Sequence, residues 1–223
     1  MVRVVVFLKL PHPGEVKTRL AHSVGKEKAA ALYRTWVPPF IQSLTHHRSE
    51  ISLEVALAPP ENGLTTKEAL IEEAKDWLGC DLDWSIQVGV GLGERLKRAF
   101  EEQFDKEWNR VLALGTDSPH LSWHDLSTCI HLLTANSLVL GPTEDGGYYT
   151  VGMNQRPGTL FQEVRWSSPS TYRDTESAAR NMGWSIGRGP LSYDIDTIAD
   201  LNRLIDERAM DCWPDLESIL KEE

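Results

Sequence analysis

The sequence predicts an α/β fold, in which a mainly parallel mixed sheet carries helices on both faces. Apolar, β-branched runs alternate with amphipathic helical patterns up to residue 141, as they do in chains that build parallel sheets. The first run, VRVVVFLKL, is almost continuously apolar, which is typical of a strand covered on both faces. With 223 residues and no linker, repeat or low-complexity segment, the chain is expected to form one domain, residues 1–223.

The alternating elements can be assigned in order from these patterns. Strands are expected at 2–10, 51–60, 84–89, 110–115 and 137–141. Helices are expected at 29–44, 66–79 and 92–104, and from Ser122 onward. Pro38 and Pro39 lie inside the first helix and should kink or divide it, because proline has no backbone N–H. Ser122 and Asp125 form a capping box for the fourth helix.

The alternation changes after residue 141. GGYYTVGM, residues 146–153, is expected to form an extra strand or hairpin. Residues 168–183 should contain a helix, with Ser168 as its cap, Pro169 at its first position and Gly183 just past its end. Residues 190–209 are predicted to form a strand that leads into a last long helix.

The composition excludes several classes of function. The net charge is −10 and there is no basic block, so neither nucleic acid nor an anionic membrane is an expected partner. No apolar run approaches the roughly 20 residues that span a bilayer, and the apolar N-terminus breaks at Pro11, too early for a signal peptide. Cys80, Cys129 and Cys212 are odd in number and far apart, which favours a reducing compartment. The expected location is the cytoplasm.

Ligands of open α/β sheets bind beyond the carboxyl ends of the strands, so the loops there are the candidate sites. The first loop, KLPHPGEVKTRL, holds Lys9, Lys17 and Arg19. Its prolines stiffen it and Gly14 permits close backbone approach, which together predict a cradle for a diphosphate. The alternative is a solvated basic loop, and the spacing of a Walker loop is missing.

The second loop, QVGVGLGERL, contains Gly89, Gly91 and Gly93, with Arg95 behind them. The glycine spacing does not match a dinucleotide-binding fingerprint. Close approach of the backbone to a nucleotide or sugar and a simple turn are both consistent with it.

The third loop, LGTDSPHL, places Asp117 at the end of a buried strand. Mg²⁺ or Mn²⁺ prefers one or two carboxylates and otherwise binds water and phosphate oxygens, so Asp117 is a candidate metal ligand. Capping of the following turn is the alternative. Because Ser122 already caps the next helix, a role as metal ligand is favoured for Asp117 over a role as a cap.

Two further acidic segments follow. GPTEDGGYYTVG brings Glu144 and Asp145 next to two glycines and Tyr148, a combination suited to holding sugar hydroxyls or deprotonating an acceptor, although a hairpin turn alone explains Asp-Gly. In SYDIDTIADL, Asp194 and Asp196 would share one strand face and face one metal or substrate. The helix-start box that begins at Thr197 explains these aspartates equally well.

Six stretches in order, between residues 9 and 201, resemble a bacterial family with the glycosyltransferase-A, or nucleotide-diphospho-sugar transferase, fold: KLPHPGEVKTRLA, GLGERL, LGTDSPHL, LGPTEDGGYYTVGM, VRWSSPST and DIDTIADL. Its members include glycosyltransferases of the arsenosugar-biosynthesis type. The first-loop and strand-end patterns also resemble phospholactate guanylyltransferases and molybdenum-cofactor nucleotidyltransferases.

The resemblance implies roles for individual residues. Asp117 and Asp196 would bind Mg²⁺ or Mn²⁺, with Asp194 as the alternative to Asp196. The nucleotide-binding residues would be Lys9, Lys17, Arg19 and Thr116. The sugar or acceptor would meet Gly146, Gly147, Tyr148 and Arg95, with Asp145 as the catalytic residue. One departure stands out: Asp117 is followed by Ser118-Pro119 rather than completing Asp-x-Asp, so it would hold the ion loosely until the nucleotide arrives.

The sequence therefore predicts a metal-dependent glycosyltransferase that passes a sugar from a nucleotide sugar to a small acceptor. The alternative from the same fold is a nucleotidyltransferase that releases pyrophosphate from a nucleoside triphosphate. A nucleotide-sugar binding protein without turnover is the alternative from another class. The sequence selects no oligomeric state.

Overall fold

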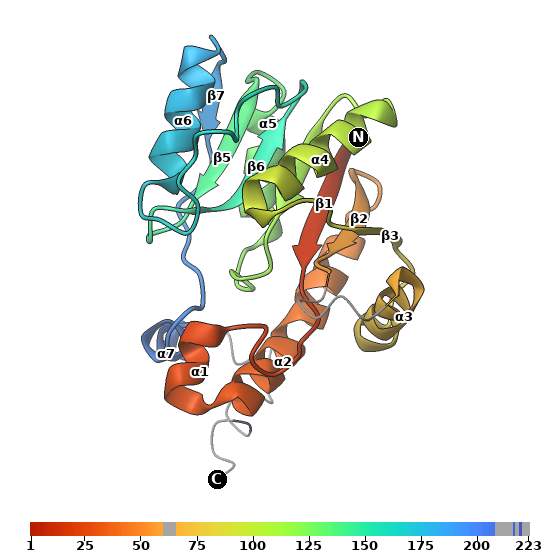
Figure 1. Cartoon of the computed structure of the whole chain (residues 1–223), viewed down its shortest axis with the longest axis vertical. Coiled ribbons are helices and arrows are strands. Elements are labelled where there is room, and N and C mark those ends of the chain that lie inside the picture. The colour runs from red at the N-terminus through yellow and green to blue at the C-terminus, as the bar shows by residue number, and fades with distance from the viewer. Residues whose placement is uncertain (60–65, 208–215, 217–218, 220–223) are drawn as a thin grey trace.

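A central sheet organises the described part of the chain, which comprises residues 1–59, 66–207, 216 and 219. Its seven strands are β1 (Val2–Leu8), β2 (Ile51–Leu57), β3 (Asp83–Ile86), β4 (Val111–Leu114), β5 (Leu138–Pro142), β6 (Tyr148–Met153) and β7 (Ile186–Arg188). In this computed structural model they lie in the order β3-β2-β1-β4-β6-β5-β7 (Figure 1). Only β6 runs antiparallel to its neighbours β4 and β5 among these strands. The predicted mainly parallel mixed sheet is confirmed.

Helices cover both faces of the sheet. They are α1 (Thr18–Val24), α2 (Lys26–Thr45), α3 (Lys67–Leu78), α4 (Gly91–Asp105), α5 (Trp123–Leu132), α6 (Thr171–Asn181) and α7 (Ile198–Asp206). Val4 and Val6 of β1 pack into the core formed with α2, α3, α5 and α7. Val5, between them, faces the core formed with α4 and α6. The first strand reads as continuously apolar because both of its faces are buried.

Helix α2 continues through Pro38 and Pro39, so the predicted division of this helix is wrong. Pro38 has no N–H to offer the carbonyl oxygen of Arg34, four residues earlier. The indole Nε1 of Trp77, on α3, donates a hydrogen bond to that oxygen at 3.0 Å. A tertiary contact thus satisfies the carbonyl that the proline leaves without its helical partner, and sequence periodicity gives no sign of it.

Two further boundaries differ from the predictions. Helix α1 lies within the segment expected to be a loop, and α6 begins at Thr171 rather than near Pro169. The backbone N–H of Thr171 bonds the carbonyl of Ser168 at 3.0 Å, so a separate turn precedes α6. Gly183, with φ of 73°, follows the end of α6 as expected.

The predicted strand at residues 190–195 is also wrong. In this segment only Ser192 pairs, in an isolated bridge with Thr143, and the strand of this region is β7. Both predicted helix-start boxes, at Ser122 and Thr197, are present. Helix α7 ends at Asp206, and the predicted helical residues 208 and 209 lie outside the described residues.

No helix in the described residues is long and apolar enough to cross a membrane. Cys80 and Cys129 are free thiols. Cys212 lies outside the described residues.

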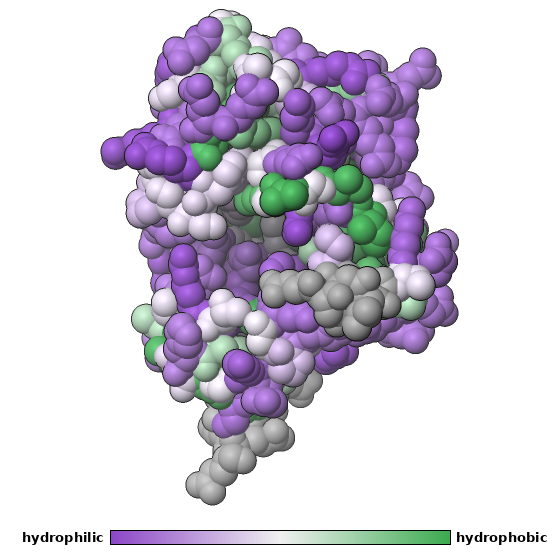
Figure 2. Space-filling view, viewed as in Figure 1, coloured by the Kyte–Doolittle hydropathy of each residue, from purple (hydrophilic) through white to green (hydrophobic). Residues whose placement is uncertain are grey.

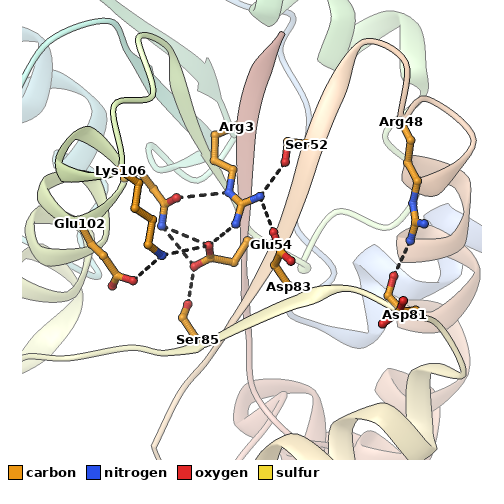
Figure 3. Close-up of polar contacts among 10 residues, drawn as sticks. Arg3, Arg48, Ser52, Glu54, Asp81, Asp83, Ser85, Glu102 and Lys106 are labelled. Atoms are coloured by element: carbon orange, nitrogen blue, oxygen red, sulfur yellow. Dashed lines mark hydrogen bonds and ion pairs between the residues drawn. The ribbon is translucent and has the colours of Figure 1, made fainter.

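A buried ion-pair network ties β1, β2 and α4 together (Figure 3). Arg3 Nη2 lies 2.5 Å from Glu54 Oε2, and the two side chains are 5% and 3% exposed. Arg3 Nη1 also contacts Asp83 Oδ2 at 2.7 Å, while Gln103 Nε2 donates to both carboxylate oxygens of Glu54 at 3.2 Å. Arg3 stands at the start of β1, so the network lies near the end of that strand opposite to the loops considered next.

Candidate functional site

A cavity of about 660 Å³ opens where β1 and β4 end. Figure 2 shows a hollow on one face of the molecule, bordered by hydrophilic and hydrophobic residues. Eight of the predicted site residues line the cavity: Lys9, Lys17, Arg19, Arg95, Thr116, Asp117, Tyr148 and Asp196. Tyr148 reaches this edge because β6 is antiparallel and begins where β4 ends. The volume is within the range of about 300–1,000 Å³ that is typical of small-molecule sites.

Lys17 is the most constrained cation of the cavity wall. It precedes α1 in the left-handed conformation, with φ of 47°, which is uncommon for a residue other than glycine. Its side chain is 2% exposed, and its ammonium group forms an ion pair with Asp117 Oδ1 and lies 3.6 Å from Asp196 Oδ1. The same group lies 5.6 Å from the ring centroid of Trp36. The backbone and the packing together direct this charge at two carboxylates.

Asp117 and Asp196 come from segments that are joined by their backbones. The carbonyl of Asp117 accepts a hydrogen bond from the N–H of Ile195 at 2.8 Å. The Asp117 side chain is 54% exposed and that of Asp196 is 32% exposed, so both remain accessible from the cavity. Arg19 Nη1 donates to Asp196 Oδ2 at 3.0 Å. The sequence-predicted phosphate loop and both predicted metal ligands therefore meet at one place.

The two carboxylates fit a hard divalent cation that is shared with phosphate. They converge on one cation, the Lys17 ammonium, which shows that their oxygens point at a common position. No cluster of three or more His, Cys, Asp or Glu side chains suited to a metal occurs in the described residues. Magnesium is commonly held by one or two carboxylates, with water and substrate phosphate completing its coordination, and two aspartates meet that need.

Asp194 differs from Asp196 in its surroundings. Ser118 Oγ donates a hydrogen bond to Asp194 Oδ1 at 2.6 Å. Burial raises the pKa of Asp194 to about 7, with a further increase from the charge of Asp117, and Asp194 does not line the cavity. Of the two aspartates that the sequence left as alternatives, Asp196 is the one beside Lys17.

Two residues near the phosphate loop form a polar pair at the base of the cavity. The hydroxyl groups of Thr116 and Tyr33 are 2.7 Å apart, and burial raises the pKa of Tyr33. Lys9 Nζ, in the same wall, donates to the carbonyl of Glu15 at 3.3 Å. The sequence analysis missed Tyr33, because it falls on the apolar stripe of α2 and looks like any other core position.

The glycine-rich loop is held by its own side chains. Arg95 Nε donates to the carbonyl of Gly89 at 3.2 Å, which places the guanidinium at the cavity wall. Gly89 has φ of 130°. Gly93 lies inside α4, where an added Cβ would be 2.5 Å from Trp166 Nε1. The need for glycine at position 93 is therefore explained by helix packing rather than by approach to a ligand.

The turn between β5 and β6 holds the remaining predicted residues. Asp145 Oδ1 accepts hydrogen bonds from Thr143 Oγ1 at 2.6 Å and from the N–H of Gly147 at 2.9 Å. Gly146 has φ of 89°, and a Cβ there would lie 2.1 Å from the carbonyl oxygen of Pro169. Asp145, Gly146 and Gly147 do not line the cavity, in contrast to Tyr148. Asp145, Gly146 and Gly147 therefore stabilise the conformation of the turn.

Tyr148 faces the cavity beside the segment of residues 166–167, for which the sequence predicts no site residue. Its ring packs edge-on against Trp166, with centroids 6.4 Å apart, and burial raises its pKa. Ser167, next to Trp166, has φ of 53° and also lines the cavity. A left-handed serine has no distinct sequence signal, so only the fold reveals it.

His120 is a second residue that sequence reasoning missed. Its ring stacks on Tyr193 with centroids 4.0 Å apart, and its Nε2 lies 3.0 Å from Ser192 Oγ. Burial lowers the pKa of His120 to about 4. It lies three residues after Asp117, in the same loop between β4 and α5.

We expect His120 to contribute a loss of stability between pH 6.5 and pH 4, opposed over this range by Asp194, whose pKa burial raises to about 7. Above pH 6.5 the imidazole is neutral in both states, whereas below it the unfolded chain binds the proton first, because the folded pKa is lower. Urea unfolding at pH 7, 6 and 5 measures this slope. His120→Gln should show a shallower decline over the same window, and parallel declines for both proteins would rule out His120 as the source.

Several solved structures resemble the chain. A “putative nucleotide-diphospho-sugar transferase” from Desulfovibrio desulfuricans G20 is 29% identical, with a TM-score of 0.83, covering 99% of this chain and 96% of its own. A CMP:2-keto-3-deoxy-manno-octonic acid synthetase complexed with CTP is 13% identical, with a TM-score of 0.55 and coverages of 94% and 99%. Rv0371C from Mycobacterium tuberculosis H37Rv, in complex with manganese, is 14% identical, with a TM-score of 0.54 and coverages of 92% and 97%.

The last two structures share the fold alone with this chain. No curated protein sequence matches it. A family model described as “Uncharacterized protein conserved in bacteria (DUF2064)” matches residues 43–168, which is more than half of the chain. The fold is that of nucleotide-diphospho-sugar transferases, and the chain belongs to the DUF2064 family of bacterial proteins.

Proposed function

We propose that the protein is a metal-dependent glycosyltransferase that transfers a sugar from a nucleotide sugar to a small acceptor. One observation carries the proposal: two cations, Lys17 and Arg19, and two carboxylates, Asp117 and Asp196, meet on one wall of a cavity large enough for such a donor. The 29% identical structure, covered along nearly its whole length, supports a nucleotide-sugar ligand. The quoted motifs further support the arsenosugar-biosynthesis type within this class.

The cationic wall is suited to the departure of a nucleoside diphosphate. When the bond between the sugar and the phosphate breaks, negative charge builds on the phosphate oxygen that leaves. Lys17, Arg19 and Lys9 would hold the diphosphate and stabilise that charge, and the Thr116 hydroxyl would bond the nucleotide. A Mg²⁺ or Mn²⁺ ion held by Asp117 and Asp196 would add neutralisation of the same charge. The manganese complex of a protein with this fold is consistent with such an ion.

The other side of the cavity would bind the sugar and the acceptor. Tyr148 and Arg95 line it and can contact hydroxyl groups. Asp145 lies in the turn next to Tyr148, outside the cavity lining, and would act as the base for an acceptor that extends to this turn. Both of its internal hydrogen bonds use Oδ1, and none of the described residues donates to Oδ2. Gly146 and Gly147 would keep the turn narrow enough for this approach.

A nucleotidyltransferase is the second candidate, favoured by the fold shared with a synthetase bound to CTP. In that reaction the acceptor attacks the α-phosphorus of a nucleoside triphosphate and pyrophosphate leaves. The relation to phospholactate guanylyltransferases belongs to this alternative. The same cations and carboxylates serve either leaving group, so the site geometry alone supports both chemistries.

We further propose that the chain acts as one domain in the cytoplasm, on a nucleotide sugar and a small acceptor. The net charge of −10 disfavours nucleic acid as a partner, and the free Cys80 and Cys129 thiols are consistent with a reducing compartment.

The products that leave the enzyme distinguish the two reactions. The purified protein is incubated with a panel of nucleotide sugars, or of nucleoside triphosphates, with Mn²⁺ or Mg²⁺ and candidate small acceptors. Release of a nucleoside diphosphate from a nucleotide sugar, in a metal-dependent manner, is the expected result. Release of pyrophosphate from a triphosphate, with no diphosphate release from any sugar donor, would replace the glycosyltransferase with the nucleotidyltransferase.

A further inference from the structure

Lys17 occupies the position between the two carboxylates that a divalent cation would otherwise take. Its ammonium group pairs with Asp117 Oδ1 and lies 3.6 Å from Asp196 Oδ1. Two carboxylates held this close repel one another unless a positive charge lies between them. Lys17 supplies that charge from the chain itself.

Three features hold the Lys17 side chain there. Its backbone is in the left-handed conformation at the start of α1, its stem is almost fully buried, and its ammonium group lies near the face of Trp36. Arg19, in the first turn of α1, provides a contrast, because it is 61% exposed and its ion-pair partner among the described residues is Asp196. The lysine is thus a fixed component of the site, whereas the arginine lies largely in solvent.

A free divalent ion that approaches this site meets carboxylates that are already neutralised. Binding would require the ion to displace Lys17, and the ammonium group would then be buried beside a like charge without its partner. The phosphate oxygens of a nucleotide remove this obstacle, since they offer Lys17 a new anionic partner and bring further ligands for the ion. Lys9 lines the same cavity, but its ammonium group donates to the carbonyl of Glu15 and pairs with no carboxylate in the described part of the chain, so it creates no such competition.

We propose that Lys17 excludes free divalent metal from the site, so that the ligand the protein accepts is the metal–nucleotide complex. This inference rests on the proposed function. It assigns Lys17 two successive partners, the Asp117 and Asp196 carboxylates before binding and the nucleotide phosphates after it. Bound nucleotide would consequently increase the affinity for the metal, and bound metal would increase the affinity for the nucleotide.

The test measures Mn²⁺ binding without nucleotide, by the loss of the electron paramagnetic resonance signal of the aqueous ion. Lys17→Met removes the charge and keeps a long stem against Trp36. We expect it to bind Mn²⁺ at least tenfold more tightly than the unaltered protein, and to bind Mn²⁺–nucleoside diphosphate more weakly. Lys17→Gly, which suits the left-handed backbone, serves as a second variant if the methionine perturbs folding, as judged by circular dichroism.

Two control variants test whether a change in Mn²⁺ affinity is specific to Lys17 and its carboxylate partner. Lys9→Met removes one positive charge from the same cavity and should change Mn²⁺ affinity less than threefold. The double variant Lys17→Met/Asp117→Asn should not show the increase in Mn²⁺ affinity expected for Lys17→Met, because it lacks the carboxylate that Lys17 neutralises.

Equal Mn²⁺ affinity in the Lys17 variants and the unaltered protein would overturn the inference, even where the unaltered protein binds Mn²⁺–nucleotide as proposed. If Lys17→Met and Lys9→Met increase the affinity for Mn²⁺ equally, the inference is also overturned. The loss of one positive charge from the cavity would then explain the increase. If the unaltered protein binds no nucleotide with any metal, the proposed function fails, and the Mn²⁺ comparison still decides whether Lys17 blocks the metal.

Discussion

Asp117→Asn is expected to weaken metal-dependent nucleotide binding by about 100-fold, and to reduce turnover at least as much. The amide has the shape of the carboxylate but carries no charge, so it binds a divalent cation poorly. The Asp117 side chain is half-exposed, but its partner Lys17 is almost fully buried and would keep only Asp196, so the free energy of unfolding should fall by about 1–3 kcal/mol. Isothermal titration of a nucleoside diphosphate, with and without Mn²⁺, measures the effect.

Glu15→Gln is the matched control for this variant. Glu15 also lines the cavity, but its carboxylate contacts only His12 among the described residues. Its substitution should leave the metal-dependent affinity within a factor of about two. If the two variants lose affinity equally, the general negative charge of the cavity matters rather than a ligand role for Asp117.

Arg3→Met is expected to lower the free energy of unfolding by about 3–5 kcal/mol. The substitution leaves Glu54 buried without the guanidinium that it faces at 2.5 Å (Figure 3). Lys106, 3.8 Å from Glu54, compensates only in part, because its own side chain is 47% exposed. Urea unfolding followed by circular dichroism measures the change.

The double variant Arg3→Met/Glu54→Leu should recover more than half of the loss, because no uncompensated charge then remains. Lys97→Met, which removes a surface pair with Glu101, should change the free energy by less than about 0.5 kcal/mol. A loss below about 1 kcal/mol in Arg3→Met would mean that the network contributes little. Nucleotide binding should persist in all of these variants, since about 13 Å of β1 separates Arg3 from Phe7, the first residue of this strand that lines the cavity.

Local patterns were sufficient to predict most of the fold. Apolar runs located six of the seven strands of the described sheet, and two capping boxes located the starts of α5 and α7. The errors fell where distant parts of the chain decide the outcome. Trp77 satisfies the carbonyl opposite Pro38, and β7 is a three-residue strand that exists through pairing with β5. Neither relation leaves a trace within a short window of sequence.

The candidate site, like the fold, could be predicted from the sequence only in part. The order of strands places the loops that hold Lys17 and Asp117 at one edge, as the rule for α/β sheets predicted. The sequence was unable to predict that Lys17 would be buried, that Tyr33 would pair with Thr116, or that Ser167 would adopt a left-handed backbone at the cavity wall. Each of these depends on packing between elements that are far apart along the chain.

The hairpin that joins β5 to β6 also limits how this protein can vary in length. Tyr148 and Tyr149 are successive residues on opposite faces of β6: Tyr148 packs against the core beside α4 and α6, and Tyr149 lies in the core beside α5. Insertion or deletion of one residue in the turn before them would shift the register of β6 and exchange the two rings. The irregularity already present at Gly141/Pro142 leaves little freedom to absorb such a change. Exposed positions of this turn can therefore change in identity, while its length is fixed.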